Sequence, residues 1–382
     1  MIKREKRMKR SDSIFPIETN DLFMNSLRKL WEDGCFDEYS DDHVLIRALN
    51  NDINAFGNII KRLKHCSWDY PSDKIDSFTF LINFSNRLDS LIALFGYKQI
   101  ADFVKSQLSA GKKRYDENTF LEAYTEILVL YYIGTFGPIC VSAQYEPTIG
   151  EGNHNPEASF EFENGARLDV EVKTARIADS FYKDEVYMPL RCMDKKGIEK
   201  FEKQCGEYGV KAVRPRIGKL KDFINSACQK FENIETNKHY NVLVINVSSS
   251  NLRVYPYLEI AMLLDNPING IFRSPLIADN YEISRELYSK VSAIFIISNS
   301  VEIMAFTDLR YLFASRNACM ILNPYILDTE EKQTDFLSIL QMRKNDFSCK
   351  MDAEVYFDCE RKPSPYFLYL LRKCVEENRI VI

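Results

Sequence analysis

Residues 156–173 restrict the fold of this chain more than any other stretch, because two alternating segments flank a turn. The segments read Pro-Glu-Ala-Ser-Phe-Glu-Phe and Ala-Arg-Leu-Asp-Val-Glu-Val-Lys, and Glu-Asn-Gly lies between them. Asn-Gly between alternating apolar residues is the strongest short-range signal for a β-hairpin. The chain therefore contains an antiparallel strand pair, and the register of that pair decides which side chains share a face.

The loop of this hairpin holds two residues or three, and the side-chain pattern decides between them. A two-residue loop pairs Glu163 with Ala166 and mixes phenylalanines with charged residues on one face. A three-residue loop pairs Phe162 with Ala166 and separates the faces completely, so burial of the apolar face favours it. Gly165 then supplies the left-handed conformation of the third loop position. The apolar face holds Ala158, Phe160, Phe162, Ala166, Leu168, Val170 and Val172.

The polar face of the hairpin sets two carboxylates against each other. Glu157 lies opposite Glu171, with Cβ atoms about 5 Å apart, and like charges in such a pair repel unless a cation lies between them. Lys173 comes two residues after Glu171 and points the same way. Two oxygen ligands and one ammonium group suit a hard divalent ion and an attacking water. We expect these three groups to project together into water.

The competing interpretation of this face is a solvent-exposed surface with ordinary ion pairs, each worth well under about 1 kcal/mol. Arg167, opposite Glu161, is expected to form such a pair. Asp169 lies on the same face and is a candidate for a further metal ligand. The elements that surround the hairpin favour a site over a plain surface.

Those elements follow the order helix, three strands, helix, strand. The pattern predicts a helix over 119–133 that ends at Gly134, and strands at 138–145, 157–162, 166–173 and 241–247. Between the last two strands, an apolar stripe from Ile217 to Phe231 predicts an amphipathic helix.

Together with this order, Pro156-Glu157 and Glu171-Val172-Lys173 resemble the signature of the PD-(D/E)xK nucleases of the restriction-endonuclease-like superfamily. The resemblance covers residues 117–248. It implies an α/β fold with a mixed-sheet core and a DNA endonuclease that needs Mg²⁺ or Mn²⁺, in restriction, repair or anti-phage defence. The family usually has aspartate where this chain has Glu157, whose side chain is one methylene longer, so the metal placement differs.

The resemblance also assigns roles to residues. It makes Glu157, Glu171 and the Val172 carbonyl metal ligands, and it makes Lys173 the group that orients the attacking water or assists its deprotonation. Family members also carry a glutamate on the helix before the first strand. Glu122 and Glu126 share one face of that helix. Glu126 lies eight residues before Gly134 and matches the family better, as a ligand that acts directly or through water.

The second helix carries the remaining candidates. The family often has a polar residue on this helix that faces the site, and here Gln229 is the candidate. The residues Arg214, Arg216, Lys219 and Lys221 cluster where the helix begins. These charges and the backbone amides there would bind nucleic-acid phosphates. A solvated helix start is the alternative.

Outside this core the sequence carries no chemistry that we can name. Residues 1–115 are expected to form an all-helical domain, with helices at 21–31, 44–63, 75–95 and 97–110, and 116–250 the nuclease-like core. Residues 251–382 are expected to form an α/β extension packed on the core. It should contain a strand at 291–297 and helices near 331–344 and 364–377.

Composition excludes several classes of protein. The 50 basic and 55 acidic residues give a net charge of −5, which weighs against a passive binder that coats nucleic acid with its whole surface. The ten cysteines and four histidines show no zinc-site spacing. No apolar run approaches the roughly 20 residues of a membrane-spanning helix. Unpaired cysteines without an export signal predict a cytoplasmic protein.

Two rival functions stay open at the level of sequence. One is a non-catalytic nucleic-acid-binding or scaffolding module on the same fold. The other is a nuclease that cuts RNA with the same site. DNA is the expected substrate, and a second copy of the chain or a partner protein is expected to supply specificity.

Overall fold

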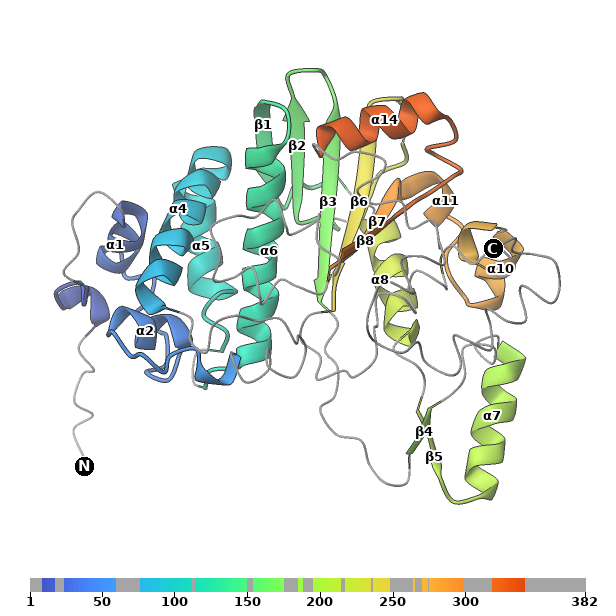
Figure 1. Ribbon diagram of the computed structural model, residues 1–382, viewed down its shortest axis with the longest axis horizontal. Coiled ribbons are helices and arrows are strands. Elements are labelled where there is room, and N and C mark those ends of the chain that lie inside the picture. The colour runs from blue at the N-terminus through green and yellow to red at the C-terminus, as the bar shows by residue number, and fades with distance from the viewer. Residues whose placement is uncertain are drawn as a thin grey trace.

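The computed structural model describes residues 9–17, 24–59, 76–111, 114–149, 154–174, 185–187, 195–213, 217–234, 236–247, 264, 270–273, 275–297 and 318–340. Within these residues the chain folds around a six-stranded mixed sheet (Figure 1). Its strands, in spatial order, are β1 (Cys140–Tyr145), β2 (Ala158–Phe162), β3 (Arg167–Thr174), β6 (His239–Asn246), β7 (Ala293–Ile297) and β8 (Ala318–Leu322). Strand β2 runs antiparallel to β1 and β3, β6 and β7 run parallel to β3, and β8 runs antiparallel to β7.

The β2–β3 hairpin has the register that its side-chain pattern predicts. Phe160 lies opposite Leu168, and the amide of Phe162 donates to the Ala166 carbonyl at 2.9 Å. Gly165 has a φ of 77°, so the third loop position is left-handed as expected. All the residues of the predicted apolar face are buried, which confirms the three-residue loop.

Helices cover both faces of the sheet. The long helix α6 (Glu117–Phe136) packs on one face, and α8 (Ile217–Lys230) packs on the other. Because side chains alternate along a strand, Val242 and Val244 join the α6 cluster while Leu243 and Ile245 join the α8 cluster. This arrangement confirms the α/β class.

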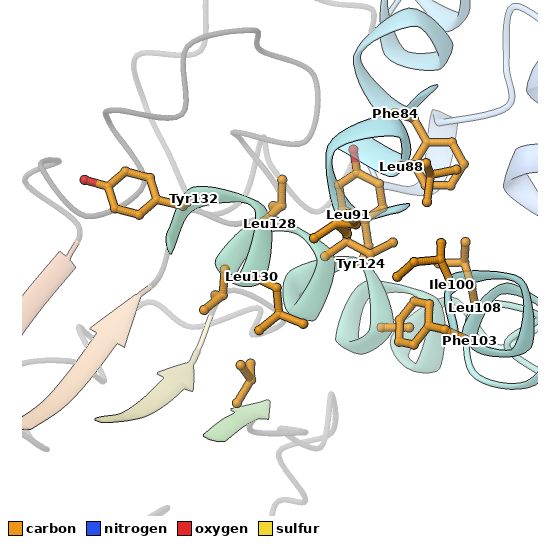
Figure 2. Packing of buried hydrophobic residues seen from close by; sticks show 14 of the residues in the cluster. Phe84, Leu88, Leu91, Ile100, Phe103, Leu108, Tyr124, Leu128, Leu130 and Tyr132 are labelled. Carbon is orange, nitrogen blue, oxygen red and sulfur yellow. The ribbon is translucent and has the colours of Figure 1, made fainter. Parts of the chain in front are cut away.

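A second group of helices packs beside α6, and one of its members also reaches the sheet at strand β1. It contains α1 (Asn25–Glu32), α2 (Val44–Leu49), α4 (Ser77–Phe95) and α5 (Tyr97–Ser106). Figure 2 shows Leu88 and Leu91 of α4 near Tyr124 and Leu128 of α6 in a shared apolar cluster. Helix α6 is therefore buried on nearly all sides, as an apolar helix in the middle of a protein must be.

The remaining elements are short or peripheral. Helix α14 (Glu330–Ile339) packs into the α6 cluster, and α10 (Pro275–Asn280) and α11 (Leu287–Lys290) pack into the α8 cluster. Helix α7 (Lys195–Glu207) accompanies a two-stranded parallel sheet of β4 (Glu185–Tyr187) and β5 (Lys211–Val213). Two 3₁₀ turns span Arg10–Asp12 and Ile271–Arg273. None of the helices in the described part of the chain is long and apolar enough to span a bilayer.

Two predicted helix ends are wrong. The helix expected over 44–63 ends at Leu49, because Asn51 adopts a left-handed φ of 59° and Asp52 accepts hydrogen bonds from Arg47 and the Asn54 amide. Helix α6 runs past Gly134 to Phe136. A Cβ atom at Gly134 would overlap the Leu94 side chain of α4, so this glycine permits close helix packing instead of a helix end. The helix expected at 364–377 lies outside the described residues.

Candidate active site

The three predicted catalytic groups meet at the end of the hairpin remote from its loop. Glu157 directly precedes β2, and its neighbour Ala158 pairs with Val170, so the same register sets Glu157 opposite Glu171. Lys173 lies two residues further along β3, and its Nζ atom is 2.5 Å from Oε1 of Glu171. The hairpin therefore brings the three groups to one face.

The expectation that these groups project into water is wrong for the carboxylates. The side chain of Glu171 has no exposed surface, and that of Glu157 is 14% exposed. Helix α8 covers this face of the hairpin, because it contacts strand β3 and its residues Ile224 and Ala227 share an apolar cluster with Leu243 of the neighbouring strand β6. The end of the polar face that holds Glu157 and Glu171 is therefore buried, whereas Glu161 nearer the loop is exposed.

Lys230, the last residue of α8, enters the site and was missed by the sequence reasoning. Its Nζ atom lies 2.7 Å from Oε1 and 3.0 Å from Oε2 of Glu171, and 3.7 Å from Oε1 of Glu157. The sequence predicts that Gln229 of this helix faces the site, but its side chain is exposed. Adjacent helix residues point about 100° apart. Lys230 flanks the apolar stripe while Gln229 lies opposite it, so helical phase was the signal that favoured Lys230.

Glu126 approaches the same region from α6. Its side chain is buried, and the Tyr145 hydroxyl donates a hydrogen bond to its Oε1 atom at 2.9 Å. Tyr145 in turn accepts from Nε2 of Gln107 at 3.3 Å. The neighbour of Glu126, Thr125, accepts a hydrogen bond from the buried Asn246 side chain of β6 at 2.9 Å. These bonds hold α6 in a fixed position against the sheet.

A cavity of about 420 Å³ lies between α5, α6 and the end of β3. Glu126, Val172 and Lys173 form part of its wall. Glu122, the other helix glutamate considered from the sequence, also lines it. The remaining lining residues are Ser106, Gln107, Gly111, Thr119, Ala123 and Thr174. The cavity offers space beside Glu122, Glu126 and Lys173 for a small ligand or part of a larger one.

Burial and mutual repulsion shift the acid equilibria of the site. Burial, and then the charge of Glu171, raise the pKa of Glu157 to about 7. Burial, followed by the charge of Glu157, raises the pKa of Glu126 well above its usual value. For Lys230, burial lowers the pKa, but the charges of Glu171 and Glu157 outweigh it and the pKa rises. Ionisation of Glu157 and Glu126 therefore carries an energetic penalty, which the Lys230 charge partly relieves for Glu157.

Asp169 belongs to a separate ion-pair network and is not a further ligand of this site. Its carboxylate lies 2.9 Å from the Arg167 guanidinium and 2.9 Å from Nε2 of His239. Arg167 also pairs with Glu232, which follows α8, at 3.2 Å. Asp169 and Glu232 therefore take the place of Glu161, the partner predicted for Arg167. Asp169 has no exposed surface, and its oxygens are already engaged.

The predicted phosphate-binding residues are only partly described. Arg214 and Arg216 lie outside the described residues, as does the side chain of Lys219. Lys221 forms an ion pair with Glu282.

Among the described residues, no group of three or more His, Cys, Asp and Glu side chains is arranged to hold a metal ion. The donor chemistry nevertheless suits a hard divalent cation, because carboxylate and carbonyl oxygens are its preferred ligands and the opposed acids are already neutralised by ammonium groups.

Comparisons with family models, curated proteins and solved structures give no match to this chain. Fold and site therefore define an α/β protein with a buried acid and lysine cluster.

Proposed function

We propose that this protein is a divalent-metal-dependent endonuclease that hydrolyses phosphodiester bonds in DNA. One observation carries the proposal: the opposed pair Glu157 and Glu171 shares a face with Lys173, which contacts Glu171 at 2.5 Å. The elements α6, β1, β2, β3, α8 and β6 also follow the helix, three strands, helix, strand order of the PD-(D/E)xK nucleases that the sequence resembles, with β4, α7 and β5 inserted between β3 and α8.

In this proposal Glu157, Glu171, the Val172 carbonyl and Glu126 hold Mg²⁺, or Mn²⁺ in its place. The bound ion would lower the pKa of a water and neutralise charge that develops on the phosphate. Lys173 orients that water or assists its deprotonation from its position on β3. Tyr145 holds Glu126 in place through the hydrogen bond at 2.9 Å.

The substrate and biological setting rest on the resemblance. It implies DNA as the substrate, in restriction or anti-phage defence. Arg214, Arg216, Lys219 and Lys221 would bind backbone phosphates, and Lys221 would exchange its ion pair with Glu282 for that contact. A second copy of the chain or a partner protein would supply target specificity, and the protein would act in the cytoplasm.

Plasmid cleavage tests the proposal. Supercoiled and linear DNA are incubated with the protein in Mg²⁺, in Mn²⁺ and in EDTA. We expect cleavage only with metal, and a rate about 10² to 10⁴ times lower for Lys173→Ala, because one positioned proton-transfer group contributes about that much. Lys332→Ala, which removes a lysine of α14 from its surface pair with Asp328, is the matched control and should cut normally. Equal cleavage by Lys173→Ala and wild type would show that the site is not catalytic.

A non-catalytic module is the second candidate, and Lys230 is the observation that favours it. Its ammonium compensates the buried acids without a metal, as a purely structural ion cluster would. Calorimetric titration discriminates between the two, since such a module would bind neither Mg²⁺ nor Mn²⁺. A parallel digestion of RNA and DNA of the same sequence separates the third candidate, an RNA-cutting enzyme.

A further inference from the structure

An ammonium group lies where an ion shared by Glu157 and Glu171 would lie. Nζ of Lys230 is within 3.0 Å of both oxygens of Glu171 and within 3.7 Å of Glu157. The side chain of Lys230 is 20% exposed, so most of it is buried within the site. The two acids thus already share one cation that belongs to the chain itself.

We propose that Lys230 is a positioning residue that holds Glu157 and Glu171 together in the metal-free protein, and that a divalent ion binds by displacing its ammonium group. This inference rests on the proposed function, since it concerns the same metal site. It adds a residue outside the Glu-x-Lys segment, on a different element, that sets how tightly metal binds.

Lys230, and not Lys173, is the group that must move. Lys173 contacts Oε1 of Glu171 from the same strand, and its backbone adjoins Val172, whose carbonyl is a proposed ligand. Lys230 reaches both acids from the end of α8, with its Nζ atom 2.7 Å from Glu171 and 3.7 Å from Glu157. The exchange moves one flexible side chain and leaves the strand pair intact.

The end of α8 gives the displaced ammonium a favourable place to remain. The last carbonyl groups of a helix carry partial negative charge, which stabilises a nearby cation. The side chain has four methylene groups and needs only a rotamer change to leave the carboxylates. Lys230 therefore competes with metal without blocking it.

The competition predicts that removal of the charge at position 230 tightens metal binding. In wild type the two acids and two ammonium groups cancel, whereas a neutral residue 230 leaves a net negative site for the incoming ion. We expect Lys230→Met to bind Mn²⁺ at least about tenfold more tightly than wild type, because one unit charge at such short range has a large effect even at a high effective dielectric constant.

The experiment is calorimetric titration of the full-length protein with Mn²⁺ and with Mg²⁺ at pH 8. Lys230→Met and Lys230→Gln should both bind more tightly than wild type, and Lys230→Arg, which keeps the charge, should not. Lys332→Met, a loss of one lysine from the surface of α14, is the matched control and should leave affinity unchanged. Thermal shift with and without Mn²⁺ verifies folding and gives a second readout, with a larger metal-induced shift in the two neutral variants.

The outcomes separate this inference from the proposed function. Unchanged or weaker Mn²⁺ binding in both neutral variants, with wild-type binding that Glu171→Gln abolishes, would overturn the role of Lys230 and leave the metal site standing. Absence of binding in wild type and in all position-230 variants would overturn both. Binding by the neutral variants alone would also support the inference, because the Lys230 ammonium of wild type would then outcompete the metal at the concentrations used.

Discussion

At the scale of single residues, the site depends on acids held where water is scarce. Glu171 is fully buried beside two ammonium groups, and Glu157 faces it at the edge of the same hairpin. An unpaired charge in such a place costs several kcal/mol, and removal of one partner leaves the other exposed to that cost. The same arrangement makes the stability of the metal-free protein depend on pH.

Glu157 gives this dependence a definite sign. Its pKa is about 7 in the folded protein and 4.5 as an ordinary carboxyl group, so the folded state binds more protons between these values. The free energy of unfolding therefore falls as pH rises from about 4.5 to about 7. We expect Glu157→Gln to remove this contribution, which is on the order of 3 kcal/mol.

Urea denaturation in EDTA at several pH values between 4.5 and 8 measures the effect. The quantity of interest is the difference between wild type and Glu157→Gln, because other groups titrate too. The pKa of His43 is lowered to about 4, first of all by burial, so His43 contributes stability that increases with pH and is present in both proteins. Parallel pH profiles for the two proteins would mean that Glu157 does not carry a raised pKa.

At the scale of elements, the distance between α4 and α6 is set by a glycine. Gly134 lies inside α6, and a Cβ atom there would overlap Leu94 of α4 and contact Phe160 of β2. Helix propensity alone predicts that alanine stabilises such a position by up to about 1 kcal/mol. Because Glu126 lies on the same helix, this contact also helps to hold a site residue in place.

We expect Gly134→Ala to destabilise the protein by no more than about 1 kcal/mol, since the added Cβ displaces only the end of the Leu94 side chain and helix propensity offsets part of the overpacking. Gly206→Ala is the matched control: this glycine is in α7, and no atom lies within 4 Å of an added Cβ. It should be neutral or slightly stabilising. Leu94→Ala combined with Gly134→Ala should cost less than the sum of the single variants. Additive losses in the double-mutant cycle would show that the two residues do not meet.

At the scale of the whole molecule, the N-terminal helices and the sheet share one apolar cluster. It extends from Phe15 through α4 and α6 to the strands and to Leu340. Tyr124 of α6 contacts the rings of Phe80 and Phe84 of α4, at 5.6 and 5.8 Å between centroids. Helix α6 therefore depends on both neighbours for burial of its side chains.

Removal of residues 1–115 should expose the outer face of α6. We expect a fragment that begins at residue 116 to bind a hydrophobic dye and to aggregate, because large exposed apolar patches promote association. Size-exclusion chromatography and dye fluorescence, with the full-length chain as reference, provide the measurement. A monomeric fragment with a cooperative unfolding transition would instead identify the N-terminal helices as an independent domain.

Much of the fold could be predicted because its signals are local. The alternation of residues 158–172 determined the hairpin register, and that register determined that Glu157, Glu171 and Lys173 share a face. Helix periodicity likewise located α4, α6 and α8. It predicted the wrong helix end near Asn51, which adopts a left-handed conformation, and near Gly134, which packs against Leu94. Periodicity describes which side of an element a residue occupies, and says nothing about what covers that side.

Only the tertiary structure decided that the acidic face is buried and that Lys230 lies within it. Lys230 and Glu171 are 59 positions apart, and no local pattern joins them. Their contact follows from the packing of α8 on β6, a sum of many apolar contacts between distant segments. The position of Glu126 beside Tyr145 has the same origin. The sequence by itself thus determined that Glu157, Glu171 and Lys173 share one face of a hairpin, while long-range packing determined their surroundings and their charge.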